Sequence, residues 1–255
     1  MPRALGKRDA VVNPHIPLLR AMTMRHDEPP EPINWYAAVG GWPMLRNDVL
    51  GCCVPAAAWH HIQQRLAYAG RPFEPTDGMT EALYSAWAGW DPANPRSDIG
   101  TLMSEAMVRW ARDGIVLPDG TVDKPDAVAA VDHITLGWLR YAIWRCGAVL
   151  VGLNCPTAWL EDDLYLLDVP EAGDVPIAGG HCMLLVGCEV TAIGYEFDAI
   201  SWGERHRTTW RAMERLADEA YAILSRDWVD ASGQDPAGIE WEVAQAAMAT
   251  LRGIA

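Results

Sequence analysis

The chain has 255 residues, 50% of them hydrophobic, which is enough for one large core or for two lobes of a single domain. Its formal net charge of −14 argues against nucleic acid as a partner, and no apolar run approaches the roughly 20 residues of a membrane-spanning helix. No signal-peptide pattern is present, so export by that route is not expected, and six scattered cysteines indicate reduced thiols.

Residues 1–32 are predicted to form a basic arm that precedes the folded domain. Within residues 1–26, five basic residues face one acidic residue: Arg3, Lys7, Arg8, Arg20 and Arg25 against Asp9. A short basic segment with prolines is typical of a disordered tail, and its charge also suits docking on an acidic surface.

Residues 33–131 are predicted to form a helical lobe. A helix is expected to begin at Cys53, because Pro55 suits the first helical turn and three alanines follow it. Two further helices are expected over Thr80–Trp90 and Leu102–Asp113, the second because its apolar residues recur at near-helical spacing.

From residue 132 to about residue 230 the pattern changes to short β-branched or aromatic segments bounded by Gly, Pro or Asp, which predicts a β lobe. Strands are expected over Ala148–Leu153, Cys182–Cys188, Gly194–Trp202 and Ala220–Leu224, with a helix over Thr209–Leu216. Residues 231–255 are predicted to form a C-terminal helical extension, since residues 236–252 are amphipathic. The predicted class is α+β, with a helical lobe facing an antiparallel β lobe.

Three short motifs carry the chemistry of this sequence. The first is Gly51-Cys52-Cys53, with Asn47 six residues before Cys53. The second is Gly180-His181 with Val186-Gly187 behind it, and His181 lies 128 residues after Cys53. The third is Ser201-Trp202-Gly203. In this order and spacing, residues 42 to 230 resemble the papain-like cysteine peptidases, whose base follows the nucleophile at about this distance.

The resemblance implies a papain-like two-lobe fold and a role for each matched residue. Cys53 would be the nucleophile and His181 the general base and then acid. Asn47 stands where the family has an oxyanion-hole Gln. The groove beside them would be lined by Gly100, Gly180 and Trp202, with Trp202 shielding the base from water. The substrate would be a peptide or protein, and neither a cofactor nor a metal is implied.

Physical chemistry supports the role given to Cys53. A thiol is a good nucleophile only as thiolate, and a helix N-terminus beside an imidazolium lowers its pKa. The side-chain amide of Asn47 could join the Cys53 backbone N–H in an oxyanion hole, although it is one methylene shorter than Gln. One such donor is worth on the order of 100- to 1000-fold in turnover.

Ile200 departs from the family pattern, because it stands where papain-like enzymes have the Asn that orients the base. An apolar side chain can make no hydrogen bond to His181. The other groups that could orient His181 are Asp198, Ser201, a backbone carbonyl or a water molecule.

Two functions are therefore predicted: a cysteine peptidase or amide hydrolase acting through a Cys-His dyad, or a catalytically silent papain-like domain used as a structural or adaptor protein. Acyl transfer to an amine would use the same dyad.

The remaining cysteines and histidines are expected to be structural. A zinc site built from Cys52, Cys53, His60 and His61 is not expected, because adjacent histidines on a helix project about 100° apart. Cys52 is interpreted as a packed thiol.

The composition, rich in Arg and Trp and poor in Lys and Phe, together with the segment from Asp218 to Trp228, resembles papain-like proteins of actinobacterial tailed phages. This second resemblance implies a location in the virion or the host cytoplasm, with virion proteins as partners of the arm. Papain-like zymogens carry a longer pro-segment, so residues 1–32 are expected to be a tether.

Overall fold

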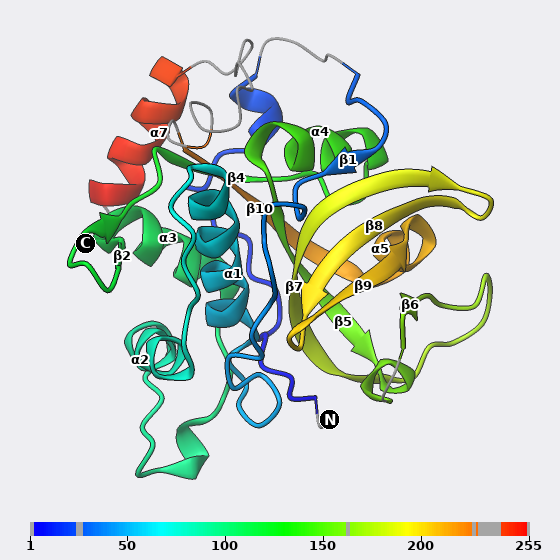
Figure 1. The fold of residues 1–255 in the computed structure, drawn as a ribbon, viewed down its shortest axis with the longest axis horizontal. Helices are drawn as coiled ribbons and strands as arrows, with labels where there is room; N and C mark the ends of the chain where they lie inside the picture. The colour runs from blue at the N-terminus through cyan, green and yellow to red at the C-terminus, as the bar shows by residue number, and fades with distance from the viewer. Residues whose placement is uncertain (1–2, 24–27, 162–163, 226–227, 229–240, 254–255) are drawn as a thin grey trace.

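The computed structural model describes residues 3–23, 28–161, 164–225, 228 and 241–253. Its α-helices are α1 (Cys53–Tyr68), α2 (Asp77–Ala88), α3 (Met103–Asp113), α4 (Leu136–Cys146), α5 (Trp210–Leu216) and α7 (Trp241–Gly253). Short 3-10 helices cover Leu19–Ala21, Pro95–Ser97 and Thr157–Leu160. In Figure 1 most of the helices lie on one side of the molecule and most of the sheet on the other.

Within the described residues, the main sheet has eight strands and is antiparallel apart from one parallel pair, β6 with β9. The strand order is β4-β10-β5-β7-β8-β9-β6, and β1 pairs with β7 beside this path. The strands are β1 (Ile33–Asn34), β4 (Ala127–Ala130), β5 (Val149–Pro156), β6 (Leu166–Leu167), β7 (Ile177–Thr191), β8 (Gly194–Ser201), β9 (Glu204–Thr209) and β10 (Ala217–Leu224). A separate pair joins β2 (Ile115–Val116) to β3 (Val122–Asp123). The predicted α+β class is confirmed.

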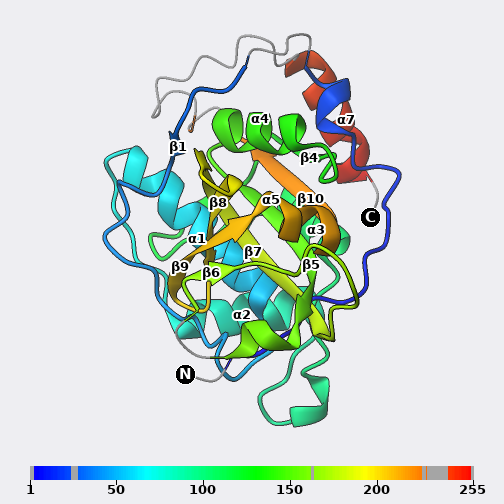
Figure 2. The ribbon, with the colours of Figure 1, turned by 90° about the vertical axis from the view of Figure 1, so that its right-hand side faces the viewer.

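Helix α1 begins at Cys53, as predicted, and forms the centre of the molecule. Every residue from Cys53 to Arg65 is buried, because the helix packs against the sheet at β7 and against α2. Figures 1 and 2 show α1 running beside β7, between the sheet and the other helices of this lobe. The run of small side chains after Pro55 allows this close packing.

Helix and strand boundaries differ from the prediction where a local cap or a long pairing decides them. Helix α2 begins three residues before Thr80, because the Thr76 hydroxyl accepts a hydrogen bond from the Met79 N–H at 3.4 Å. Strand β7 extends beyond both ends of the predicted Cys182–Cys188, since β5 pairs with its first half and β8 with its second. Helix α4 was not predicted, and neither were the strands β1, β2, β3, β4, β6 and β9.

The C-terminal helix α7 packs on the helical lobe. Arg252 on this helix donates hydrogen bonds to the carbonyl oxygens of Ala111 and Pro125, both at 3.1 Å. Residues 236–240 of the predicted helix lie outside the described residues. The division into 1–32, 33–230 and 231–255 stays a prediction. Within the described part of the chain, no helix is both long and apolar enough to cross a membrane.

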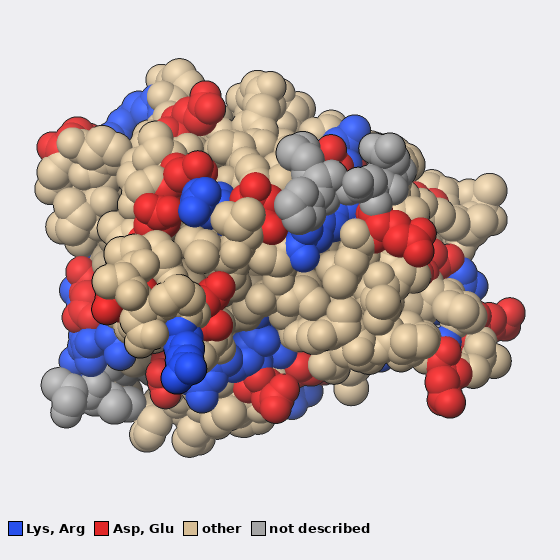
Figure 3. Space-filling model, turned by 90° about the horizontal axis from the view of Figure 1, so that it is seen from below, with Lys and Arg blue, Asp and Glu red and all other residues tan. Residues whose placement is uncertain are grey.

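Residues 3–8 of the N-terminal arm pack against the domain, and the role of the arm as a tether stays a prediction. This segment runs between the helical lobe and the β lobe, where its backbone bonds to both. Figure 3 shows the molecule from below, with acidic side chains interspersed among the basic ones. Residues 3–8 are held in a groove between the two lobes.

Candidate active site

Residues 3–8 fill a groove whose two walls come from different lobes. The Lys7 N–H donates to the Gly180 carbonyl oxygen of β7 at 3.0 Å. On the opposite wall the Thr101 N–H donates to the Gly6 carbonyl oxygen at 2.7 Å, and the Arg8 N–H donates to the Thr101 carbonyl oxygen at 3.0 Å. The arm therefore binds as an extended strand, by the main-chain hydrogen bonds that a peptide of any sequence can make.

Asn47 and Trp202 contact the same arm residue, Ala4. The Ala4 N–H donates to the Asn47 carbonyl oxygen at 2.9 Å. The Ala4 carbonyl oxygen accepts from the Trp202 indole N–H at 3.2 Å and lies 3.4 Å from the Asn47 amide nitrogen. The side-chain amide predicted to stabilise an oxyanion thus already faces a peptide carbonyl.

Glycine lines the groove wherever the arm backbone passes closest. A Cβ at Gly100 would overlap the Gly6 carbonyl oxygen, and one at Gly180 would overlap the Lys7 carbonyl oxygen. A Cβ at Gly6 itself would overlap the backbone of Gly51. The structure therefore brings Asn47, Gly100, Gly180 and Trp202, each predicted from the sequence, around residues 4–7. Their role toward a substrate stays a prediction.

Cys53 lies beneath this segment, at the first residue of α1. Its side chain is buried, and burial raises the pKa of the thiol to about 11. Backbone hydrogen bonds from Cys182, Gly6 and Val54 and the charge of Lys7 oppose this rise. With the arm in place, the thiol is neutral at neutral pH. The arm's Gly6 is one of the groups that contact it.

His181 lies in β7, beside Cys182, and is completely buried. Its Nε2 is 2.6 Å from Ser201 Oγ, and its ring stacks on Trp202 with centroids 4.1 Å apart and planes at 10°. Burial, and then the charges of His206 and Arg3, lower the pKa of His181 to about 3. The imidazole is therefore neutral, and it is held in one plane by a hydroxyl and an indole.

Ser201 makes the hydrogen bond that the sequence left open among several candidates. It is the last residue of β8, and the backbone turns directly after it, where Trp202 has a φ of 48°. Ile200 instead pairs with Leu184 across β7 and β8 and is buried in the core. Asp198 is held by Arg205 at 2.7 Å and Arg207 at 3.3 Å, so its carboxylate has partners other than the base.

A hydrogen-bond network that the sequence did not reveal holds the helical wall of the groove. Asp98 Oδ1 accepts from the Gly51 N–H at 3.0 Å and from the Tyr84 hydroxyl at 2.6 Å. The same Tyr84 hydroxyl accepts from the Gly100 N–H at 2.8 Å. The network fixes Gly51, next to the cysteines, relative to Gly100. Gly100 was predicted to line the groove, but no sequence signal pointed to Tyr84.

The remaining candidates are structural. The Cys52 thiol is buried and donates to the Leu45 carbonyl oxygen at 3.3 Å, as expected of a packed thiol. His60 bonds through Nε2 to the Pro43 carbonyl oxygen at 2.9 Å, and His61 packs edge-on against Trp110. Among the described residues, no group of three or more His, Cys, Asp and Glu side chains could hold a metal ion.

Solved structures of similar fold are cysteine proteases. Xylellain from Xylella fastidiosa has a TM-score of 0.64 at 12% identity, over 88% of this chain and 96% of that one. Digestive procathepsin L 3 from Tenebrio molitor larval midgut has a TM-score of 0.58 at 13% identity, covering 82% and 76% of the two chains. The proform of the ragweed pollen allergen Amb a 11, a cysteine protease, has a TM-score of 0.56 at 16% identity, over 78% and 66%.

Neither a protein-family model nor a curated protein sequence matches this chain. At these identities the similarity shows the fold alone. The predicted papain-like two-lobe fold is confirmed.

Proposed function

We propose that this chain is a papain-like cysteine peptidase or amide hydrolase held latent by its own N-terminal arm. The observation that carries the proposal is a length of the chain's own extended backbone lying over Cys53, at the start of α1, between main-chain groups of Thr101 and Gly180. Such a groove fits a peptide. Two of the solved structures described above are proforms of cysteine proteases.

The reaction follows from the residues around the arm. The Cys53 thiol gives its proton to His181, and the thiolate attacks the carbonyl carbon of the substrate. The Asn47 amide and the Cys53 backbone N–H stabilise the oxyanion. His181 then protonates the leaving amine, which leaves a thioester on Cys53. Water, deprotonated by His181, attacks that thioester and releases the acid and the free thiol. An amine in place of water would give acyl transfer.

Latency has an electrostatic cause in this proposal. With the arm bound, the pKa of Cys53 is about 11 and the pKa of His181 is about 3, so both groups are neutral across the physiological range. Departure of the arm would reduce the burial that is the largest cause of both shifts, and it would remove the charge of Arg3, which lowers the pKa of His181. It would also remove the Gly6 hydrogen bond and the Lys7 charge, which lower the pKa of Cys53 by less than burial raises it. The pKa of Cys53 would then fall and the pKa of His181 would rise, so the ion pair becomes accessible.

Labelling by iodoacetamide tests the assignment of the nucleophile. We expect Cys53 to be the thiol that reacts first among the six, because it combines a helix N-terminus with a candidate base. Cys53→Ala should abolish this labelling and lower any peptide turnover by more than about 1000-fold, as loss of a nucleophile does. Cys52→Ala is the matched control and should change neither by much. First labelling at Cys52, seen by peptide mass spectrometry, would contradict the assignment.

Ser201 is a positioning residue in this proposal, since it contacts His181 and not the substrate. We expect Ser201→Ala to lower kcat/KM by about 100-fold, the lower end of what general acid–base catalysis contributes. Its pH–rate profile should shift, because the hydroxyl that bonds Nε2 is lost, and Ser201→Thr should restore both. An unchanged profile with a lowered melting temperature would assign Ser201 a purely structural role.

Phage origin, a location in the virion or host cytoplasm, and virion partners stay predictions of the sequence. The second function, a silent papain-like domain acting as a structural or adaptor protein, differs from the first in one measurable way. It requires Cys53 to keep an ordinary thiol reactivity after the arm leaves the groove.

A further inference from the structure

The Lys7 side chain leaves the groove and enters a pocket between β5 and β10. The side chain is 1% exposed, and its Nζ lies 2.7 Å from Asp218 Oδ2 and 3.6 Å from Glu219 Oε1. Its aliphatic stem passes over Gly152, where a Cβ would lie 2.5 Å from Lys7 Cε and 2.7 Å from Glu219 Cγ. The missing side chain at Gly152 therefore makes the room that the stem occupies.

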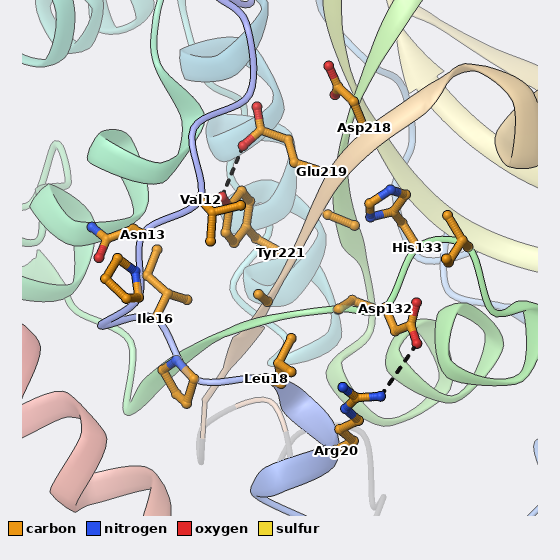
Figure 4. Close-up of a pocket in the computed structure, with 16 residues that line it drawn as sticks. Val12, Asn13, Ile16, Leu18, Arg20, Asp132, His133, Asp218, Glu219 and Tyr221 are labelled. Atoms are coloured by element: carbon orange, nitrogen blue, oxygen red, sulfur yellow. Dashed lines mark hydrogen bonds and ion pairs between the residues drawn. The ribbon is translucent and has the colours of Figure 1, made fainter.

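A β-bulge explains how two successive residues both reach Lys7. Neighbouring residues on a regular strand point to opposite faces. The pairing of β10 with β5 shifts register between Ala217 and Glu219, so Asp218 is the extra residue. Both carboxylates can then approach one ammonium group. Figure 4 shows Asp218 and Glu219 side by side on β10, close to His133.

The pocket holds two carboxyl groups against the single ammonium group of Lys7. Glu219 is 7% exposed, and burial raises its pKa while Lys7 opposes the rise. The Tyr221 hydroxyl donates to Glu219 Oε2 at 2.9 Å, whereas Glu219 Oε1 and Asp218 Oδ1 are buried and accept no hydrogen bond. Once the arm leaves, two adjacent carboxyl groups are left without a cation. Another cation entering the pocket would relieve this unfavourable state.

We propose that this pocket is a specificity subsite that takes the Lys or Arg side chain of a peptide bound in the groove. The inference rests on the proposed function for the identity of the groove, and the arm shows how the side chain enters. Arginine fits the chemistry at least as well as lysine, because its planar guanidinium has five donors, whereas Asp218 Oδ1 accepts no hydrogen bond and Glu219 Oε1 has only the 3.6 Å ion pair with Lys7. Asp218 and Glu219 also border a cavity of about 590 Å³ (Figure 4).

Binding of peptides in trans tests the pocket without needing turnover. The protein is the full-length Gly6→Val, Cys53→Ala chain, in which the valine keeps the arm out of the groove. The probes are peptides with the sequence of residues 3–10, carrying Lys, Arg, Met or Glu at the place of Lys7. We expect the Arg peptide to bind at least as tightly as the Lys peptide. The Met peptide should bind about 10- to 100-fold more weakly, the usual value of a hydrogen bond to a charged group.

Asp218→Asn with Glu219→Gln in the same chain should reduce the preference for Lys over Met to less than about threefold, because the charges are gone while the Tyr221 hydrogen bond is kept. Glu74→Gln, an exposed carboxylate far from the arm's contacts, controls for net charge and should leave the preference intact. Equal binding of the Lys and Met peptides by the chain with Asp218 and Glu219 intact would contradict the proposal that this pocket binds a basic side chain.

Measurements of turnover then show whether the pocket selects substrates or only holds Lys7 of the arm. The Gly6→Val chain with Cys53 intact is given a library of fluorogenic peptides in which each position is varied in turn. We expect cleavage only of peptides with Arg or Lys at one fixed position. Cleavage without that preference would overturn the subsite while supporting the peptidase. Absence of all cleavage, with the basic preference kept in binding, would count against the peptidase and leave the pocket supported as a binding site.

Discussion

In the Gly6→Val variant we expect iodoacetamide to label Cys53 faster than in the unaltered chain, because the added side chain overlaps the Gly51 backbone and excludes the arm from the groove. Loss of the burial alone, which returns the thiol pKa from about 11 to the ordinary 9.0, raises the thiolate fraction at neutral pH about 100-fold, and an active pair with His181 requires a pKa below 9.0. Since a thiolate of lower pKa is a weaker nucleophile, the rate should rise between about 10- and 100-fold.

The pH dependence of that gain shows whether its cause is electrostatic. The ratio of the two rates should be largest below pH 9 and shrink between about pH 9 and pH 11, above which both thiols are ionised. A ratio that stays constant with pH would mean that only access had changed. Gly40→Val is the matched control, because no atom lies within 4 Å of the added Cβ, and it should leave labelling unchanged. An equally slow rate in the Gly6→Val chain would contradict latency by the arm.

In the Gly180→Ala variant we expect labelling of Cys53 to rise as in the Gly6→Val chain. Its peptide turnover should nevertheless stay on the order of 100-fold below that of the Gly6→Val chain, the effect of displacing a substrate by about an ångström. The nearest atoms to the added Cβ all belong to Lys7 of the arm, so the body of the protein is undisturbed. The arm and the substrate would be excluded together, because both use the same wall of the groove. Paired measurements of alkylation and peptide hydrolysis in the Gly6→Val and Gly180→Ala chains test this.

The neighbouring Gly179 supplies the control. A Cβ there would meet the Leu5 side chain at 3.2 Å, and a flexible side chain can move aside, so Gly179→Ala should alter either rate by less than about threefold. Full turnover in the Gly180→Ala chain would show that substrate does not follow the path of the arm.

The sequence predicted those parts of the fold that depend on local pattern. The helix at Cys53, the strands around His181 and the helix over Thr209–Leu216 follow from propensity, capping and apolar runs. Helix α4 was missed because its sequence, Leu136–Cys146, is rich in aromatic and apolar residues and has no side-chain cap, so its period is obscured.

The site was less predictable, because the decisive contacts are between residues far apart in the sequence. The family pattern places the residue that orients His181 two positions before Trp202, at Ile200. In the structure, Ser201 at the end of β8 makes the hydrogen bond to His181 instead. The role of Lys7 depends on a bulge in β10, more than 200 residues away, and a bulge has no local signature in this sequence. The excess of basic residues in residues 1–26 suits acidic contacts, and one of these residues, Lys7, pairs with Asp218 and Glu219; docking of the arm on an acidic surface stays a prediction.

Because the arm is part of the same chain, its concentration at the groove is fixed by the length of the link and not by dilution. For a short flexible connection this effective concentration is in the millimolar range. A free peptide with the same contacts must therefore exceed roughly millimolar concentration to displace residues 3–8 from half of the molecules. A peptide below this concentration would leave the arm in the groove. A chain held beside the groove by an assembly or a second contact would have an effective concentration similar to that of the arm and could displace it. The covalent link to residues 3–8 thus sets a concentration threshold for the site.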